Sequence, residues 1–182
     1  MRHRAAIGIG ANLPSKVGGP METVRLAMED LAAAGRVVAR SSLYRTEPVG
    51  IAEQPAFVNA AEVVETGLDP EALLEFLLAT ERSYGRDRVH DVPKGPRTLD
   101  LDVLLIDEQV IRTERLTVPH PALAERRFVL APVAEIAPQW RHPVLGKTMR
   151  ELLADLPPNG VNGTEAVQKI GEGQCREGQP LP

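Results

Sequence analysis

An alternation of apolar and polar residues at positions 98–105 constrains the fold of this 182-residue chain more than any other feature. Successive side chains of a β-strand point to opposite faces, so every second residue lies on one face. One set is apolar and the other begins with polar residues: Leu99, Leu101, Val103 and Leu105 alternate with Thr98, Asp100, Asp102 and Leu104. The pattern predicts a strand that buries one face and presents two carboxylates on the other.

Periodic segments elsewhere predict three more strands and two helices. The strands are expected where apolar and β-branched residues gather, at residues 5–11, 37–44 and 57–66. Helices are expected from Pro20 to Gly35 and from Asp69 to Gly85, because proline opens each one and glycine closes it. Proline and glycine mark loops at residues 46–55 and 86–96. The order β-α-β-β-α-β predicts an α+β fold, a ferredoxin-like antiparallel sheet with helices packed on it.

The apolar pattern is weaker beyond the strand at residues 98–105. Residues 109–111 are expected to pair back after a turn, and residues 122–135 to form one or two short helices interrupted at Pro132. Thr148 is expected to cap a last helix that runs to Leu156. Residues 1–156 are therefore predicted to form one domain. Among residues 157–182, nine of 26 are Gly or Pro and apolar periodicity is lost, which predicts a disordered tail.

Composition excludes several classes of function. The net charge of −4 argues against a general nucleic-acid binder, and no apolar run is long enough to span a bilayer. Cys175 is the single cysteine, so the chain can form neither an internal disulfide nor a cysteine zinc cluster. These features predict a cytoplasmic protein without nucleic-acid or membrane partners. A monomer is expected, since the sequence holds no long heptad pattern.

The carboxylates of Asp100 and Asp102 point to a cation. Two like charges on one strand face repel unless a cation lies between them, and Mg²⁺ prefers carboxylate oxygens and substrate phosphates. The alternative is that both side chains belong to a solvated outer face of an edge strand.

Basic residues gather on both sides of this strand although the chain is acidic overall. They are Arg82, Arg86, Arg88, Lys94 and Arg97 before it, and Arg112, Arg115, His120, Arg126 and Arg127 after it. Arginines suit phosphate oxygens, so carboxylates and arginines together match a polyphosphate site. The alternative is a solvated basic loop. Glu81 lies on the apolar stripe of its helix, where an arginine from the 86–97 segment would be its natural partner. The alternative is that its carboxylate reaches solvent from the end of the helix.

Several motifs, in order along the chain, resemble those of the 6-hydroxymethyl-7,8-dihydropterin pyrophosphokinase family. The longest runs from Lys94 to Leu104 and includes Gly-Pro-Arg-Thr-Leu-Asp-Leu-Asp. The others are Ile9–Leu13, Ser41–Thr46, Phe57–Ala61 and Thr113–Pro121. Together they cover roughly residues 5–140, and several motifs in order are more specific than any one alone.

The resemblance implies transfer of pyrophosphate from ATP to the pterin hydroxymethyl group in folate biosynthesis, with release of AMP. It implies that Asp100 and Asp102 hold two Mg²⁺ ions, and that Arg126 lies on a mobile loop near the transferred group. The implied catalytic residues are Arg86, Arg97, Asp100, Asp102 and Arg126. The residues implied to contact ATP are Glu81, Arg88, Arg97, Val103, Arg115, Thr117 and His120. Those implied for the pterin are Thr46, Val49 and Asn59 through hydrogen bonds, with Phe57 and Phe128 on either side of the ring.

Two other functions fit parts of the pattern. A different Mg²⁺-dependent nucleotidyl- or phosphotransferase could use the same carboxylate pair, and its coproduct would be pyrophosphate or ADP. A non-catalytic ferredoxin-like module could bind RNA on its sheet, but that use needs aromatic residues on the strand face that Asp100 and Asp102 occupy.

Overall fold

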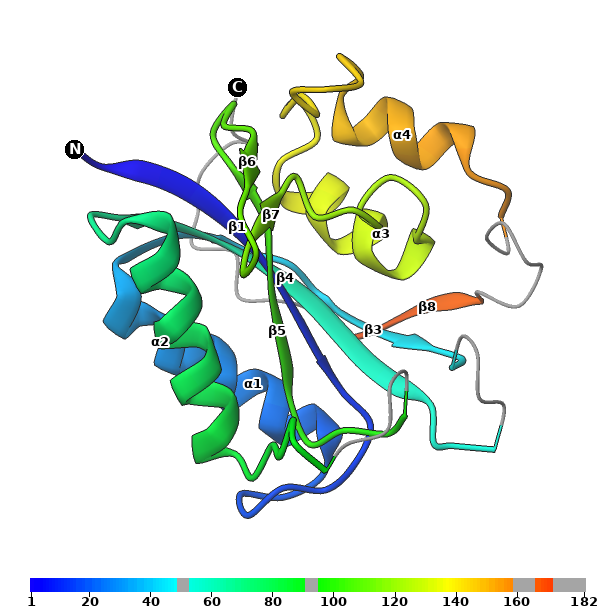
Figure 1. The fold of residues 1–182 in the computed structure, drawn as a ribbon. Coiled ribbons are helices and arrows are strands. Elements are labelled where there is room, and N and C mark those ends of the chain that lie inside the picture. Colours follow the sequence, from blue (N-terminus) through cyan, green and yellow to red (C-terminus); the bar gives the residue numbers. More distant parts are fainter. Residues whose placement is uncertain (49–52, 91–94, 159–165, 172–182) are drawn as a thin grey trace.

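A single antiparallel sheet forms the centre of the protein (Figure 1). The computed structural model describes residues 1–48, 53–90, 95–158 and 166–171. The strands of the sheet are β1 (His3–Ala11), β2 (Arg36–Arg40), β3 (Leu43–Thr46), β4 (Phe57–Thr66), β5 (Asp100–Ile106) and β8 (Val167–Gly171). They lie in the order β5-β1-β4-β3-β8, and β2 pairs with β4 beside β3. The predicted ferredoxin-like α+β fold is confirmed.

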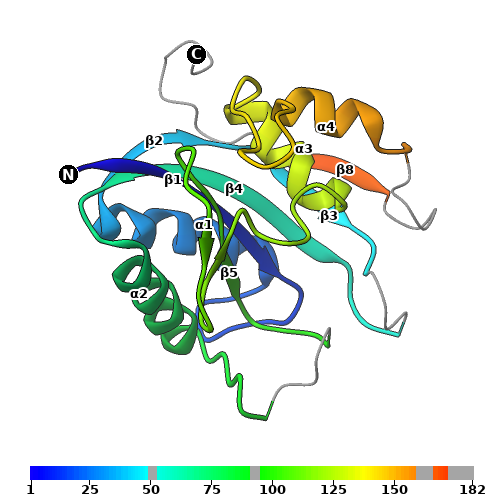
Figure 2. The same cartoon turned by 45° about the horizontal axis from the view of Figure 1, so that its top comes forward.

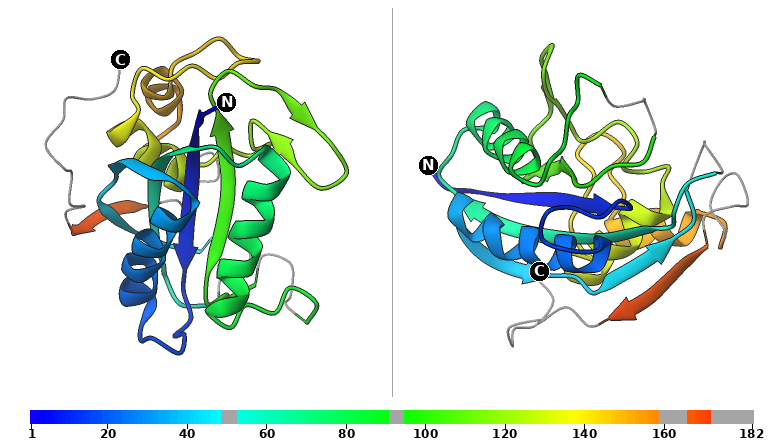
Figure 3. Two further views of the ribbon diagram at one scale, coloured as in Figure 1. Left: turned by 90° about the vertical axis from the view of Figure 1, so that its left-hand side faces the viewer. Right: turned by 90° about the horizontal axis from the view of Figure 1, so that it is seen from below.

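Helices cover both faces of this sheet, which gives the protein three layers (Figures 2 and 3). On one face lie α1 (Pro20–Asp30), its short 3-10 extension η1 (Leu31–Ala34) and α2 (Pro70–Ser83). On the other lie α3 (Arg127–Ile136) and α4 (Met149–Asp155). Each face has its own apolar core, with Val24 and Leu77 in the first and Val133 and Met149 in the second. Among the described residues, no helix has the length and apolar character required to cross a bilayer.

The helix starts follow the predicted capping chemistry. The Asp69 side chain accepts a hydrogen bond from the Ala72 N–H, and Pro70 opens α2. Thr148 and Glu151 form a reciprocal capping box at the start of α4. Both boundaries were predicted because these caps are local properties of the sequence.

The single strand expected at residues 37–44 is wrong, because the structure divides it into β2 and β3. Ser41 and Ser42 make the break. The Ser41 hydroxyl accepts a hydrogen bond from the Ala61 N–H and donates one to the Ser42 carbonyl, so side-chain bonds interrupt the strand ladder. As a result, β2 and β3 pair with different parts of β4.

The strict alternation expected along residues 98–105 also fails at its end. Ala6 pairs with Leu105 but Ile7 pairs with Val103, so Leu104 is an extra residue in β5. This bulge moves Leu105 to the face of α3 and α4, while Leu101 and Val103 pack on the face of α1 and α2. Both faces are apolar here because both are covered by helices.

Two further expectations after this strand are wrong. Pro132 lies inside one continuous helix, α3, because proline removes only the hydrogen bond to the Phe128 carbonyl while apolar residues on both sides of it stay buried. Residues 109–111 do not pair back on the preceding strand. Instead β6 (Ile111–Arg112) forms a hairpin with β7 (Thr117–Val118).

The expectation of disorder from residue 157 onward is wrong for the segment that forms β8. Val167–Gly171 adds an edge strand to the sheet by pairing with β3 (Figure 1). Backbone pairing to an open edge does not need an apolar periodicity, which is why composition alone missed it. Residues 159–165 and 172–182 lie outside the described part of the chain.

Candidate active site

A pocket of about 130 Å³ opens between the sheet and the start of α3. Five elements line it through Gly8, Ile9, Gly10, Thr46, Glu47, Phe57, Asn59, Ala60, Arg97, Asp100, Asp102, Leu104, Arg126, Phe128 and Val129. Gly10 lies close to Asn59 in this pocket: a Cβ on Gly10 would be 2.8 Å from Asn59 Oδ1, so the Asn59 side chain would have to move. Eight of the lining residues are ones that were predicted for the site: Thr46, Phe57, Asn59, Arg97, Asp100, Asp102, Arg126 and Phe128.

Asp100 and Asp102 both face this pocket from β5, as the strand period requires. The Asp100 side chain is 20 % exposed, so it can reach a ligand in the pocket. Burial, and secondly the charge of Asp100, raises the pKa of Asp102 to about 7. The pair is thus a concentration of negative charge that a cation would stabilise.

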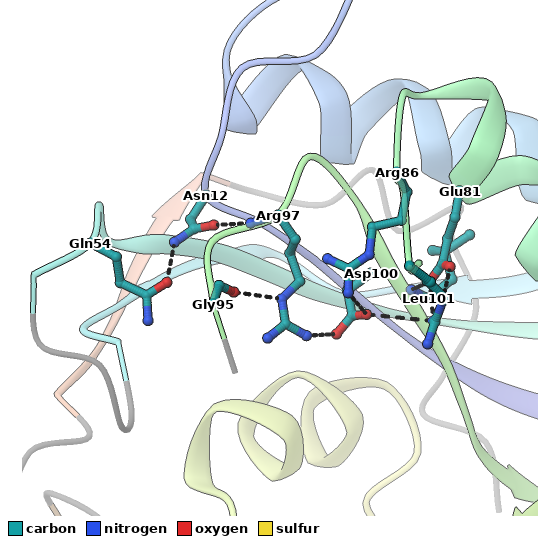
Figure 4. A network of polar contacts seen from close by, with 9 residues as sticks. Asn12, Gln54, Glu81, Arg86, Gly95, Arg97, Asp100 and Leu101 are labelled. Carbon is teal, nitrogen blue, oxygen red and sulfur yellow. Dashed lines mark hydrogen bonds and ion pairs between the residues drawn. The ribbon is translucent and has the colours of Figure 1, made fainter. Parts of the chain in front are cut away.

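Three arginines surround the Asp100 carboxylate (Figure 4). Arg97 Nη1 lies 2.7 Å from Oδ2. Arg88 Nη2 and Arg86 Nη2 lie 3.7 Å and 3.9 Å from Oδ1. Three of the basic residues that precede the strand in the sequence are therefore brought to the start of β5, an arrangement that suits phosphate oxygens.

Glu81 has the arginine partner that its position predicted. Its two oxygens accept hydrogen bonds from Arg88 Nε and Nη2 at 2.7 and 2.6 Å, and Oε1 also accepts one from the Leu101 N–H at 2.7 Å. The side chain is buried. Glu81 therefore fixes both an arginine and the main chain between the two aspartates, and it does not line the pocket.

Phe57 and Phe128 line the pocket from two different elements, the start of β4 and the start of α3. A guanidinium lies over each ring, Arg97 over Phe57 and Arg126 over Phe128, each 5.7 Å from the ring centroid. Beside them, Asn59 Nδ2 donates a 2.7 Å hydrogen bond to Thr46 Oγ1. Two aromatic faces with polar groups at the edge match a flat heterocycle.

Asn12 is a site residue that the sequence reasoning did not single out. Its Oδ1 accepts a hydrogen bond from the Arg97 N–H at 2.7 Å, and its Nδ2 donates to Gln54 Oε1 and the Pro55 carbonyl (Figure 4). It thereby joins the segments before β4 and before β5. The Asn12 side chain is buried, and its place directly after an apolar strand was the only local feature that marked it.

The remaining predicted residues that the structure describes lie outside the pocket lining. The Val103 side chain packs in the core beside α1 and α2 and does not line this pocket. Thr117 is exposed on β7, and Arg115 pairs with Glu75 of α2. His120 is partly buried, and burial together with the Arg126 charge lowers its pKa. Val49 lies outside the described residues.

The two carboxylates fit Mg²⁺ better than a metal that is held by protein ligands alone. In the described ranges, no group of three or more His, Cys, Asp or Glu side chains gathers as a metal cage. Mg²⁺ commonly takes one or two carboxylates and completes its shell with water and phosphate oxygens. Asp100 and Asp102 beside three arginines supply such a donor set.

Two relatives with similar sequences carry the same name. A relative from Methylorubrum extorquens, a 2-amino-4-hydroxy-6-hydroxymethyldihydropteridine pyrophosphokinase, is 43 % identical over 164 residues, which is 89 % of this chain and 99 % of the relative. The enzyme of the same name from Pseudomonas aeruginosa is 42 % identical over 163 residues, covering 88 % and 96 %.

Among solved structures, a Plasmodium falciparum HPPK-DHPS matches with a TM-score of 0.64 at 15 % identity. The match covers 85 % of this chain and 43 % of the Plasmodium chain, so it supports the fold alone. The model of the 7,8-dihydro-6-hydroxymethylpterin-pyrophosphokinase family matches residues 6–138. The chain therefore belongs to the 7,8-dihydro-6-hydroxymethylpterin-pyrophosphokinase family.

Proposed function

We propose that this protein transfers the β,γ-pyrophosphoryl group of ATP to the hydroxymethyl oxygen of 6-hydroxymethyl-7,8-dihydropterin and releases AMP, a step of folate biosynthesis. The observation that carries the proposal is the shared pocket, in which Asp100 and Asp102 lie beside Phe57 and Phe128. A polyphosphate site and a slot for a flat ring are thus adjacent. Family membership supports the same reaction.

In this proposal Asp100 and Asp102 hold two Mg²⁺ ions, with ATP as the cosubstrate. The ions supply charge neutralisation on the triphosphate and hold it in one orientation. The arginines neutralise the remaining negative charge of the phosphates. Arg86 and Arg97, already at the Asp100 carboxylate, contact phosphate oxygens, and Arg126 approaches from the start of α3. Arg88, Arg115 and His120 form the outer part of the phosphate site.

The reaction needs little acid–base chemistry from the protein. The hydroxymethyl oxygen attacks the β-phosphorus in line and releases its proton to water, and the bond from that phosphorus to the α,β-bridging oxygen breaks. Negative charge then develops on the α-phosphate of the departing AMP, so positioning and positive charge account for most of the rate enhancement.

The pterin lies between Phe57 and Phe128, with Asn59 at its hydrogen-bonding edge and the main chain near Thr46 and Val49 beside it. Ring stacking of this kind contributes about 1 kcal/mol per ring pair beyond the buried area. The hydrogen bond between Asn59 and Thr46 holds the amide in one orientation, so the polar edge of the slot is preorganised.

A coproduct assay tests the proposed reaction directly. With Mg²⁺, ATP and the hydroxymethyl pterin, we expect AMP and the pterin diphosphate in equal amounts, and no AMP when any one of the three is left out. Formation of ADP or free pyrophosphate as the coproduct would assign a different phosphotransferase or nucleotidyltransferase reaction to the same carboxylates.

The acidic net charge argues against nucleic-acid binding, and the single cysteine fits a cytoplasmic enzyme. We further propose a monomer, because the sequence holds no long heptad pattern. Light scattering at working concentrations should give the mass of one chain, and a dimer mass would contradict this part of the proposal.

A further inference from the structure

The carboxylate of Glu135, in the last turn of α3, collects hydrogen bonds from the edge of the sheet. Its donors are the Ser42 N–H at 2.9 Å, the Ser42 hydroxyl at 2.7 Å, the Tyr44 hydroxyl at 2.9 Å and Lys169 Nζ at 3.1 Å. Burial acts to raise the pKa of Glu135, but the bonds from Ser42, Lys169 and Tyr44 outweigh it and lower that pKa. Glu135 is thus a charged anchor between α3 and the strands β3 and β8.

Glu135 shares one face of α3 with Phe128. The two residues are seven positions apart, and seven residues make almost two full helical turns. Phe128 lines the pocket at the other end of this face. The contacts that Glu135 makes therefore set where the helix face that carries Phe128 lies against the sheet.

On the strand side, the partner of Glu135 leads to the opposite wall of the same pocket. Tyr44 and Thr46 lie on one face of β3 because they are two residues apart. Tyr44 is paired in register with Asn59, and Thr46 with Phe57. The Thr46 hydroxyl also accepts the hydrogen bond from Asn59 Nδ2. Tyr44 is thus fixed to the strands that carry Phe57 and Asn59.

We propose that Glu135 is a positioning residue for the pterin slot: through Ser42 and Tyr44 it sets the separation between the wall of Phe128 and the wall of Phe57. Lys169 brings β8 into the same anchor. The inference rests on the pterin slot of the proposed function. A slot that holds a flat ring between two faces is sensitive to small displacements, since a shift of about 1 Å can cost a large part of the rate.

The chain offers a matched pair of tyrosines for the test. Both Tyr44 and Tyr84 donate their hydroxyl to a carboxylate, and burial raises the pKa of both. The Tyr84 hydroxyl bonds Asp30 at 2.7 Å, on the face of α1 and α2 and away from the pocket. Tyr44→Phe removes one hydroxyl from the Glu135 anchor, and Tyr84→Phe removes a similar hydroxyl elsewhere.

The dissociation constant of the pterin should be measured in the presence of Mg²⁺ and a non-hydrolysable ATP analogue, beside that of the analogue alone. We expect Tyr44→Phe to weaken pterin binding by about fivefold and to leave the dissociation constant of the analogue unchanged, since fivefold corresponds to about half of the contribution of a charge-assisted hydrogen bond. Tyr84→Phe should change neither constant. Glu135→Ala should weaken pterin binding more than Tyr44→Phe does. Glu135→Gln should weaken it less than Glu135→Ala does.

Thermal unfolding shows whether each variant folds. If Glu135→Ala does not, Tyr44→Phe and Lys169→Met still test the inference, with Lys147→Met as the control because Lys147 makes a surface pair with Asp155. Suppose that Phe128→Leu weakens pterin binding but Tyr44→Phe and Lys169→Met do not. The positioning role of Glu135 would then be overturned, and the pterin slot itself would still stand. If a variant weakens the binding of the pterin and of the ATP analogue equally, its residue has a structural role only, and this result would also overturn the positioning role. An unaffected Phe128→Leu variant would reject the slot itself.

Discussion

Arg97 Nη1 lies 2.7 Å from Asp100 Oδ2. The arginine that we propose to bind phosphate is thus paired with the carboxylate that we propose to bind the metal. Without a ligand, this pairing balances the charge of both groups. In the proposed function, the carboxylate would contact Mg²⁺ and the guanidinium would contact phosphate once the ligands bind. Each charge would then keep a partner both before and after ATP binds.

The first prediction concerns the paired acids. Asp100→Asn and Asp102→Asn should each lower kcat by about 1,000-fold or more, because metal-assisted charge stabilisation contributes several kcal/mol to phosphoryl transfer. Thermal unfolding should show an unchanged or raised midpoint for Asp102→Asn, since the neutral amide removes a buried charge beside Asp100. Near-normal AMP formation in either variant would contradict the metal assignment.

Arg126 should affect chemistry more than ATP binding. Arg126→Ala should slow single-turnover AMP formation by about 10- to 100-fold, because a cation near the transferred group stabilises charge that develops in the transition state. The dissociation constant of an ATP analogue should change far less. The neighbouring arginine is the control: Arg127→Gln removes bonds to the Leu153 and Leu156 carbonyls and should leave the rate unchanged.

The phenylalanines provide a third prediction, and the chain has only three. Phe57→Leu and Phe128→Leu should each weaken pterin binding by about fivefold, which corresponds to the stacking contribution of one ring. Phe76→Leu is the matched control, since Phe76 packs on the core from α2 and does not line the pocket. Quenching of pterin fluorescence measures all three. Equal binding by the three variants would argue against ring stacking.

Glu62 predicts a pH dependence of stability. This β4 side chain is fully buried, and its Oε2 lies 3.3 Å from Arg40 Nε. Burial raises the pKa of Glu62 from 4.5 to about 8. Arg40 acts to lower this pKa, and the charge of Glu29 acts to raise it. Between these two values the folded chain binds a proton that the unfolded chain has released. The free energy of unfolding should therefore fall as the pH rises, by up to about 1.4 kcal/mol per pH unit.

Urea unfolding between about pH 5 and pH 8 measures this effect. Glu62→Gln should flatten the decline, because the amide does not titrate. Glu65→Gln on the same strand is the control: hydrogen bonding from Arg36 lowers the pKa of Glu65, so that residue changes the stability only at lower pH. Parallel pH profiles for wild type and Glu62→Gln would show that the buried carboxylate does not titrate in this range.

Local signals in the sequence predicted the elements that have strong caps and periods. Phe57–Thr66 and the start of α2 at Pro70 match their expected positions. The errors come from contacts between distant segments. The bulge at Leu104 depends on register with β1, and β8 depends on the open edge of β3. Ser41 breaks a strand through a bond to Ala61, twenty residues away.

The site divides in the same way. Asp100 and Asp102 could be placed on one face from the strand period alone, and the need of Glu81 for an arginine followed from its place on an apolar stripe. That Phe57 and Phe128 share a pocket came only from the family resemblance, since neither has a local signal. The anchoring roles of Asn12 and Glu135 rest on tertiary hydrogen bonds that no spacing reports.

Binding of Mn²⁺ in place of Mg²⁺, counted by electron paramagnetic resonance in the presence of a non-hydrolysable ATP analogue, tests the central claim most directly. We expect two ions bound per chain in the wild-type complex, and loss of tight Mn²⁺ binding in the Asp100→Asn/Asp102→Asn double variant. The same number of ions bound with the same affinity in the double variant would contradict it.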